Sequence, residues 1–278
     1  RFVVEELRRV GAEAHLAEPA ETRARRGPKR RAKTDRADAR LLRDLLLAGN
    51  LPESWIPPDH LADLRTLVRL RRVLISQRSG WLRRMHAQLF QHGVPLPPNL
   101  KTIAGRDYIK DVEVPAAARR VLDFGCATID HLDRSLDELD QEIFALARGL
   151  PGCAILRRQW GVSHVLAATI LAELGDTRRF SSSRQAVRFA GLDVTVSESD
   201  GKRLRGHISK QGSSTLRWAL YEAANAAWRV KSPDHEYYVA TKARLGTVQA
   251  RLAVARRICR RIHHELKEAG DLVLEHAA

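Results

Sequence analysis

The segment of residues 188–220, RFAGLDVTVSESDGKRLRGHISKQGSSTLRWAL, holds most of the side chains in this sequence that could do chemistry on a phosphate group. Three of its hydroxyl groups are candidate nucleophiles, those of Ser197, Ser199 and Ser209. Four of its cations could neutralise phosphodiester oxygens: Lys202, Arg203, Arg205 and Lys210. Glycines between them let the backbone approach a ligand closely. This composition is typical of a loop that handles phosphate.

Two carboxylates form a second candidate site. Asp35 and Asp38 open a predicted helix, KTDRADARLLRDLLLAGN, which Gly49 and Asn50 end. At positions i and i+3 they project on the same side of the first turn, where both could reach one hard cation such as Mg²⁺. Acidic residues are also favoured at a helix N-terminus, and Thr34 or Asp35 would serve as the N-cap. From these residues alone, metal binding and helix capping both stay open.

The charge of the chain bears on its partner. The 278 residues include 48 Lys and Arg against 33 Asp and Glu, a formal net charge of +15 with a pI near 10.5. The cations gather in runs at 23–33 and 251–261, which favours a nucleic-acid partner over a generally basic surface. In the first run we expect phosphate contacts from Arg25, Arg26, Lys29, Arg30 and Arg31.

The elements that must position these residues are mainly helical. A helix ending at Gly11 and a strand at residues 13–17 predict a partial α/β piece at the N-terminus. Two long helices follow, which we expect to pair as an antiparallel coiled coil. Their apolar stripes are Leu67, Leu70, Leu74, Trp81, Met85 and Leu89 on the first, and Ile129, Leu132, Leu136, Leu139, Ile143 and Leu146 on the second.

Short helices are predicted from Pro151 onward. The first two resemble a helix-hairpin-helix whose turn near Gly161 and Val162 would present amides to a DNA phosphate. Packing of the apolar residues around this turn is the alternative. Ser182 and Gln185 fit a capping box, and Gly191 fits a helix stop.

Two classes of protein are disfavoured. Cys126, Cys153 and Cys259 are far apart without C-x-x-C spacing, which indicates neither a disulfide framework nor a zinc site. No apolar run approaches the roughly 20 residues of a membrane-spanning helix. We therefore expect a cytoplasmic protein without a membrane partner.

The order of the motifs resembles the bacterial insertion-sequence one-ten family of transposases, the DEDD recombinases. The resemblance rests on KTDRADA at 33–39, the long helical insertion, GVSHVLAATILAELGD at 161–176, RFAGL at 188–192 and SESDGKRLRGHISKQGSSTLRWAL at 197–220. It implies the C-terminal remnant of a truncated RuvC-like (RNase H-like) domain at 1–57, a helical coiled-coil insertion at 58–150 and a helical C-terminal transposase domain at 151–278. In that family four acidic residues bind Mg²⁺, a serine is catalytic, and a bridge RNA guides the enzyme.

The family's functional residues transfer to particular positions. Asp35 and Asp38 occupy the K-T-D-x-x-D-A motif and match the last two acidic residues of the tetrad. The family serine lies seven residues after the leucine of F-A-G-L, here Leu192, and follows a glutamate, which points to Ser199. Asp200 stands where the family has glycine, so Ser197 is the alternative nucleophile. Ser209 and Ser213 fit loop or cap positions better than catalytic ones.

The other two acidic residues of the tetrad are expected upstream of Arg1, so the resemblance implies an N-terminally truncated chain. Half of a metal site should bind Mg²⁺ poorly, and we expect weak or absent recombination by these 278 residues.

The implied activity is DNA transposition by a homo-oligomeric enzyme through a phosphoserine intermediate. Two alternatives are a RuvC-type nuclease that uses water and a non-catalytic nucleic-acid binder.

Overall fold

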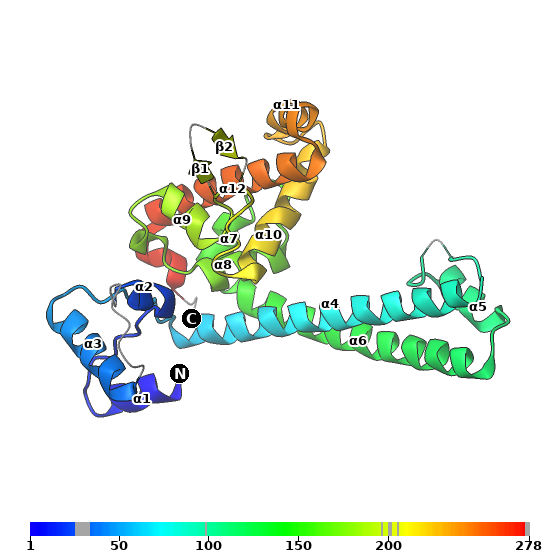
Figure 1. Cartoon of the computed structure of the whole chain (residues 1–278), viewed down its shortest axis with the longest axis horizontal. Helices are drawn as coiled ribbons and strands as arrows, with labels where there is room; N and C mark the ends of the chain where they lie inside the picture. Colours follow the sequence, from blue (N-terminus) through cyan, green and yellow to red (C-terminus); the bar gives the residue numbers. More distant parts are fainter. Residues whose placement is uncertain (26–33, 98, 196, 200–201, 205, 276–278) are drawn as a thin grey trace. The chain divides into compact units, whose positions relative to one another are not determined.

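The computed structural model describes residues 1–25, 34–97, 99–195, 197–199, 202–204 and 206–275. It is mostly helical, as predicted, and its described residues divide into two compact units at Pro58 and Asp59 (Figure 1). None of the helices among these residues is long and apolar enough to cross a membrane.

The first unit, Arg1–Pro58, contains three helices among its described residues. They are α1 (Phe2–Arg9), α2 (Pro19–Ala24) and α3 (Asp35–Leu47). The strand predicted at 13–17 was wrong except for one antiparallel bridge between Ala17 and Glu53. Hydrogen bonds from Glu18 N to Pro52 O and from Ser54 N to Leu16 O, both 2.7 Å, flank that bridge. The pairing ends there because no further strand of the described chain lies beside it.

The second unit, Asp59–Ala278, begins with a long helical hairpin. Its helices α4 (Asp59–Gln91) and α6 (Ala116–Arg148) lie side by side and run in opposite directions, with α5 (Ile103–Asp111) near the tip (Figure 1). The apolar stripe predicted on α6 is buried from Ile129 to Ile143, as expected. Coiled-coil packing between these two helices stays a prediction.

The stripe predicted on α4 was partly wrong. Leu70 is 46% exposed, and no residue of α4 between Val68 and Met85 is fully buried. Ion pairs accompany partly buried apolar residues along this stretch, joining Arg71 to Asp140 and Arg78 to Asp133 at 2.5 Å each. Each arginine is about one-fifth exposed, so these pairs are only partly screened by water.

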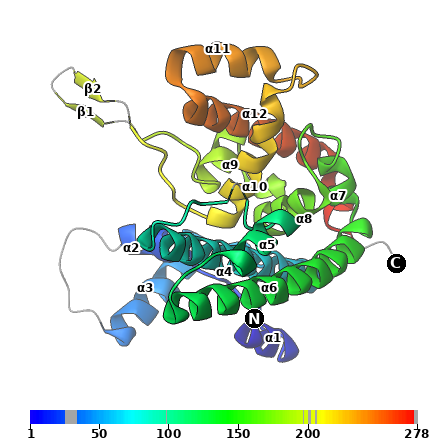
Figure 2. The same ribbon diagram turned by 90° about the vertical axis from the view of Figure 1, so that its right-hand side faces the viewer.

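The rest of the second unit packs around one helix. This helix is α8 (His164–Leu174), whose residues from Leu166 to Leu174 are all buried. The other elements after α6 are α7 (Pro151–Leu156), η1 (Thr177–Arg179), α9 (Ser183–Phe189), β1 (Ser197–Ser199), β2 (Lys202–Leu204), α10 (Ser214–Ala224), η2 (Asn225–Trp228), α11 (His235–Leu245), α12 (Thr247–Ala269) and η3 (Gly270–Leu274). Figure 2 shows α10, α11 and α12 gathered above the long hairpin.

Arginines of α4 fasten the long hairpin to α8. Arg65 Nε donates to Ala172 O at 2.7 Å, and burial lowers the pKa of its guanidinium. Arg69 donates to both carboxylate oxygens of the buried Glu173, at 2.6 and 2.9 Å. The hydrogen bond to Glu173 raises the pKa of Arg69. These bonds satisfy an anion that would otherwise be costly to bury.

The two buried cysteines, Cys153 and Cys259, should resist alkylation in the folded protein. Burial raises the pKa of the Cys153 and Cys259 thiols to about 12, so only about one in ten thousand is ionised at pH 8. Cys126 is partly exposed. Iodoacetamide at pH 8 should therefore modify Cys126 alone in the folded protein, as read by mass spectrometry, and all three cysteines in urea.

The raised pKa of these two thiols also predicts that the stability of the fold depends on pH. A thiol whose pKa is raised in the folded state ionises more readily when unfolded, so stability is lost as the pH rises from about 8.5 toward 12. Cys153→Ala and Cys259→Ala should each flatten this loss in urea titrations. In the iodoacetamide experiment, modification of Cys153 as fast as Cys126 would contradict the buried position of Cys153.

Candidate functional site

The candidate serines lie on a β-hairpin. Strands β1 and β2 pair antiparallel, with Ser199 opposite Lys202 and Ser197 opposite Leu204. Pairing continues toward the base through a bridge between Val194 and Ile208. The hairpin stands out from the helices of the second unit (Figure 2). The backbone thus brings the predicted nucleophile and a predicted phosphate-binding lysine to one register position.

Hydrogen bonds close the base of this hairpin. Thr195 donates to His207 O through both its backbone N and its Oγ1, at 2.9 Å each. Ser209 N donates to Asp193 O at 2.9 Å, and Ser209 Oγ donates to the Asp193 carboxylate. Ser209 therefore closes the loop, which agrees with its prediction as a structural and not a nucleophilic serine.

Two glycines bring the ends of this segment together. Gly191 has φ +65° and lies against Gln211 O, while Gly212 has φ +79° and lies against Phe189 O. A Cβ at either position would overlap the facing carbonyl oxygen, so glycine is required there. The predicted stop at Gly191 is confirmed, since α9 ends at Phe189.

Helices flanking the hairpin hold its base. Arg256 Nε on α12 donates to Leu192 O at 2.6 Å, and burial lowers the pKa of Arg256. Arg217 of α10 donates to Ala190 O at 3.3 Å. Both cations thus bind backbone carbonyls at the point where the chain enters the hairpin.

The predicted caps are confirmed. Ser182 accepts from Gln185 N at the start of α9, and Ser213 accepts from Leu216 N at the start of α10. The Gln185 side chain departs from a strict capping box, since it accepts from Ser181 N at 2.7 Å instead of from Ser182 N.

Only some of the other predicted cations lie among the described residues. Lys210 is exposed, has φ +55° and donates its backbone N–H to Gly191 O at 3.2 Å. Arg25 donates to Asn50 O at 2.6 Å. For Lys202 and Arg203 the register is described, with Arg203 opposite Glu198. The other predicted cations lie outside the described residues: Arg26, Lys29, Arg30, Arg31 and Arg205.

The acidic pair opens α3 in the first unit. Thr34 Oγ1 accepts from Ala37 N at 3.2 Å, so Thr34 is the N-cap and neither aspartate is needed for that role. Asp35 is exposed and Asp38 is half-buried. Among the described residues no three His, Cys, Asp or Glu side chains gather into a metal-binding group. Metal binding by Asp35 and Asp38 stays a prediction, for which their carboxylate oxygens are donors of the right kind.

The turn of the suggested helix-hairpin-helix packs against the domain. Gly161, with φ +82°, lies against Ala223 O, and the Trp160 indole donates to Ala226 O at 3.3 Å. Ser163 caps the following helix by accepting from Leu166 N. A phosphate contact at this turn stays a prediction.

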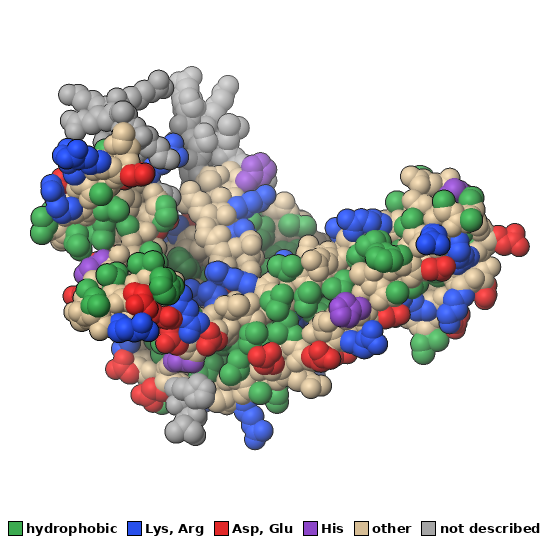
Figure 3. All heavy atoms as spheres, turned by 90° about the horizontal axis from the view of Figure 1, so that it is seen from below, with side chains coloured by type: hydrophobic (Ala, Val, Ile, Leu, Met, Phe, Trp, Pro, Cys, Tyr) green, Lys and Arg blue, Asp and Glu red, His purple; other side chains and the backbone are tan. Residues whose placement is uncertain are grey.

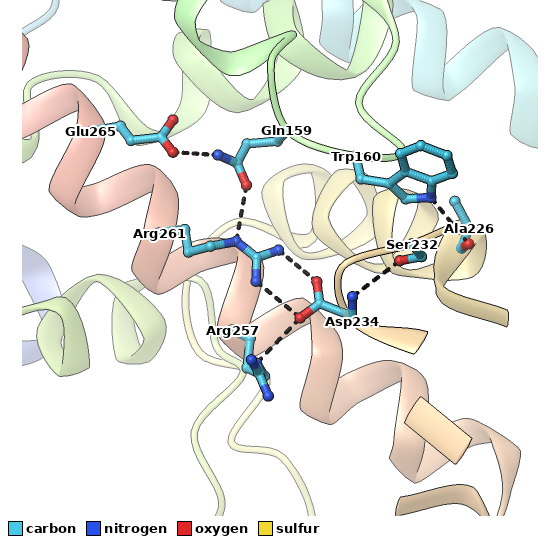
Figure 4. A network of polar contacts seen from close by, with 8 residues as sticks. All are labelled: Gln159, Trp160, Ala226, Ser232, Asp234, Arg257, Arg261 and Glu265. Carbon is cyan, nitrogen blue, oxygen red and sulfur yellow. Dashed lines mark hydrogen bonds and ion pairs between the residues drawn. The ribbon is translucent and has the colours of Figure 1, made fainter. Parts of the chain in front are cut away.

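Sequence patterns missed a polar network that joins α11 to α12. The Asp234 carboxylate accepts from Arg261 at 2.9 and 2.6 Å and pairs with Arg257 at 3.2 Å (Figure 4). Arg261 also donates to Gln159 Oε1 at 3.0 Å, and Gln159 donates to Glu265 at 2.5 Å. Asp234 is 2% exposed. Its one signal in the sequence is its position before a helix, as a possible N-cap.

Comparison with known proteins identifies the family. A model described as the transposase IS116/IS110/IS902 family matches residues 153–239, and a second, the DEDD transposase model of IS110, matches residues 2–93. The chain belongs to the IS110 family of transposases. The acidic pair and the serine hairpin each lie in a matched region.

Curated relatives agree with this family. The putative transposase y4qE of Sinorhizobium fredii is 29% identical over 75% of this chain and 50% of its own length. The transposase for insertion sequence element IS1111A of Coxiella burnetii is 24% identical over 71% of the chain and 55% of its own length. An insertion element IS116 protein of Streptomyces clavuligerus is 23% identical over 81% and 69%. The chain thus spans about half the length of the first two.

The Asp234 network gives a prediction about stability. Asp234→Ala removes the carboxylate that Arg257 and Arg261 share, and these arginines are 44% and 33% exposed. Removing one partner of a buried pair is strongly destabilising, and partial exposure of the arginines reduces the cost to about 2 kcal/mol. Urea denaturation should show this loss. The exposed Asp137→Ala should change stability by less than about 0.5 kcal/mol, and an equal loss there would refute the role of the network.

Proposed function

We propose that the protein is a DNA transposase that cuts and rejoins DNA through Ser199. Membership of a transposase family supports the activity, and the observation that carries the assignment of Ser199 is its position on β1 opposite Lys202. The Ser199 Oγ–phosphorus bond forms as a phosphorus–oxygen bond of the DNA strand breaks. The departing DNA hydroxyl takes up a proton, and a DNA hydroxyl later displaces the serine. Phosphodiester energy is conserved, so no nucleotide triphosphate is consumed.

Cations that follow the serine closely in the sequence support this chemistry. Lys202, Arg203, Arg205 and Lys210 neutralise the phosphates on either side of the scissile bond in this proposal. The basic run of Arg25, Arg26, Lys29, Arg30 and Arg31 binds the backbone of DNA or of a guide RNA. The net charge of +15 favours such polyanionic partners. We place the protein in the bacterial cytoplasm as a homo-oligomer.

Asp35 and Asp38 hold Mg²⁺ together with further oxygen donors in this proposal. A bound divalent cation would polarise the scissile phosphate. The support from the structure is that Thr34 takes the capping role, so capping accounts for neither aspartate. Two donors alone bind Mg²⁺ weakly, which is the basis for proposing weak or absent recombination by residues 1–278 by themselves.

The test is a search for a covalent protein–DNA adduct. Residues 1–278, and the same residues extended by upstream coding sequence, are incubated with Mg²⁺, candidate guide RNA and labelled element-end DNA, then denatured. We expect an adduct with the extended protein, its loss in Ser199→Ala and its retention in Ser197→Ala. Asp35→Asn and Asp38→Asn should each reduce adduct formation by at least about tenfold.

Other outcomes would change the assignment. An adduct that disappears only in Ser197→Ala moves the nucleophile by two residues along β1. DNA cleavage without an adduct makes water the nucleophile and the protein a nuclease of the RuvC type. Salt-sensitive binding without cleavage by the extended protein would make it a non-catalytic binder.

A further inference from the structure

A groove opens along the middle of the long helical hairpin. Its volume is about 720 Å³, within the range typical of small-ligand sites. We call it the hairpin groove. Its main lining residues are Gln77, Gly80, Trp81, Arg83, Arg84 and Thr128. Figure 3 shows the long helical hairpin of the second unit, where hydrophobic side chains reach the surface between charged ones.

The packing of the two hairpin helices does not require glycine at position 80. Glycine is the poorest helix former after proline, yet Gly80 lies in the interior of a 33-residue helix. Gly125 of α6 has an internal reason, because a Cβ there would lie 2.8 Å from Met85. At Gly80 a Cβ would meet only the guanidinium ends of Arg84 and Arg83, at 3.3 and 4.0 Å. The missing side chain therefore leaves space in the groove and not in the core.

An aromatic surface borders this space. The rings of Trp81 and Phe124 lie 5.3 Å apart, and Phe124 is 61% exposed. The guanidinium of Arg84 lies 5.0 Å from the Trp81 ring. Trp81 is half-buried, since it packs partly against the core of the hairpin, and it also lines the groove. Aromatic surface that reaches water is the kind of surface on which unpaired nucleobases stack.

The cations of the groove differ from other arginines of α4. Arg71 and Arg78, earlier on the same helix, are each paired with an aspartate of α6. Arg83 and Arg84 are exposed, and among the described residues neither has a carboxylate within ion-pair distance. Two exposed guanidinium groups beside an aromatic ring complement a phosphate beside a base.

We propose that the hairpin groove binds an unpaired nucleotide of a single-stranded nucleic acid. The base stacks on Trp81, Arg83 and Arg84 hold the adjoining phosphate, and Gln77 and Thr128 offer hydrogen bonds to the base edge. A base inside a duplex is already stacked on both faces and has no face for Trp81. The inference rests on the proposed function in that the partner is a nucleic acid, but it uses no residue of β1 or β2.

Charge variants test the phosphate contacts. Fluorescence polarisation with labelled dT and rU strands of about 20 nucleotides measures binding across a salt series. Arg83→Gln with Arg84→Gln should weaken binding about tenfold and reduce the salt slope by about 0.7, the contribution of the one phosphate that the two arginines no longer neutralise. Arg120→Gln with Arg148→Gln removes two exposed cations of α6 outside the groove and should change neither quantity appreciably. The two strands show whether RNA or DNA is preferred.

Two further variants separate stacking from folding. Trp81→Leu should weaken binding to a normal strand by at least about fivefold and leave binding to an abasic strand unchanged. Gly80→Ala should raise Tm by about 2 °C, because alanine favours the helix, and yet weaken binding by narrowing the groove. A variant that is more stable but binds less cannot owe its defect to unfolding.

Several results would overturn the proposal. These are equal weakening by the two double variants, equal weakening of normal and abasic strands by Trp81→Leu, or equal competition by duplex DNA. A change of sedimentation mass in the groove variants with strand binding intact would assign the groove to a second copy of the chain. Ser199→Ala should retain strand binding, so failure of the nucleophile assignment and failure of the groove are distinguishable.

Discussion

Burial of α8 is the constraint on which the second unit depends. From Leu166 to Leu174 every residue of this helix is enclosed, including the carboxylate of Glu173. A helix that is apolar on all sides has no face for water and must be surrounded. The long hairpin covers it from one direction and the C-terminal helices from others, since α8 touches α4, α6, α7 and α10. The anion of Glu173 is tolerated because Arg69 reaches it from α4.

A half-buried arginine also binds the end of α8. The guanidinium of Arg179 lies 4.2 and 4.3 Å from the ring centroids of Phe180 and Phe189, which are 5.2 Å from each other, and Arg179 donates to Leu174 O. Burial lowers its pKa to about 10, so it remains charged at neutral pH. A planar guanidinium stacks on aromatic rings, which a compact, strongly hydrated lysine ammonium does less well. Helix α9, which leads into the β-hairpin, is thereby fixed to the core.

The arginines of this chain divide into two groups by their partners. Those of the first group hold helices together and include Arg65, Arg69, Arg71, Arg78, Arg179, Arg256 and Arg261. Their charges are used within the protein, so the total of 48 Lys and Arg overstates the cations that can contact nucleic acid. Exposed cations such as Arg83, Arg84 and Lys210 remain for that purpose. This division explains how a strongly basic chain forms a compact helical unit.

The sequence alone determined the local features. Helical periodicity predicted α6 and its buried stripe, and side-chain hydroxyls predicted the caps at Thr34, Ser182 and Ser213. Motif order identified the family. These features depend on residues within a few positions of one another, which is why periodicity and spacing reveal them.

Tertiary structure decided what depends on distant partners. Leu70 is exposed although its spacing predicted burial, and arginines of α4 pair with aspartates of α6 that are 55 and 69 residues away. Asp234 is the centre of a network because Arg257 and Arg261 arrive one helix later, and the space beside Gly80 exists because Thr128 and Leu132 come from the facing helix. Spacing along the chain carries no information about such partners, since only packing brings them together.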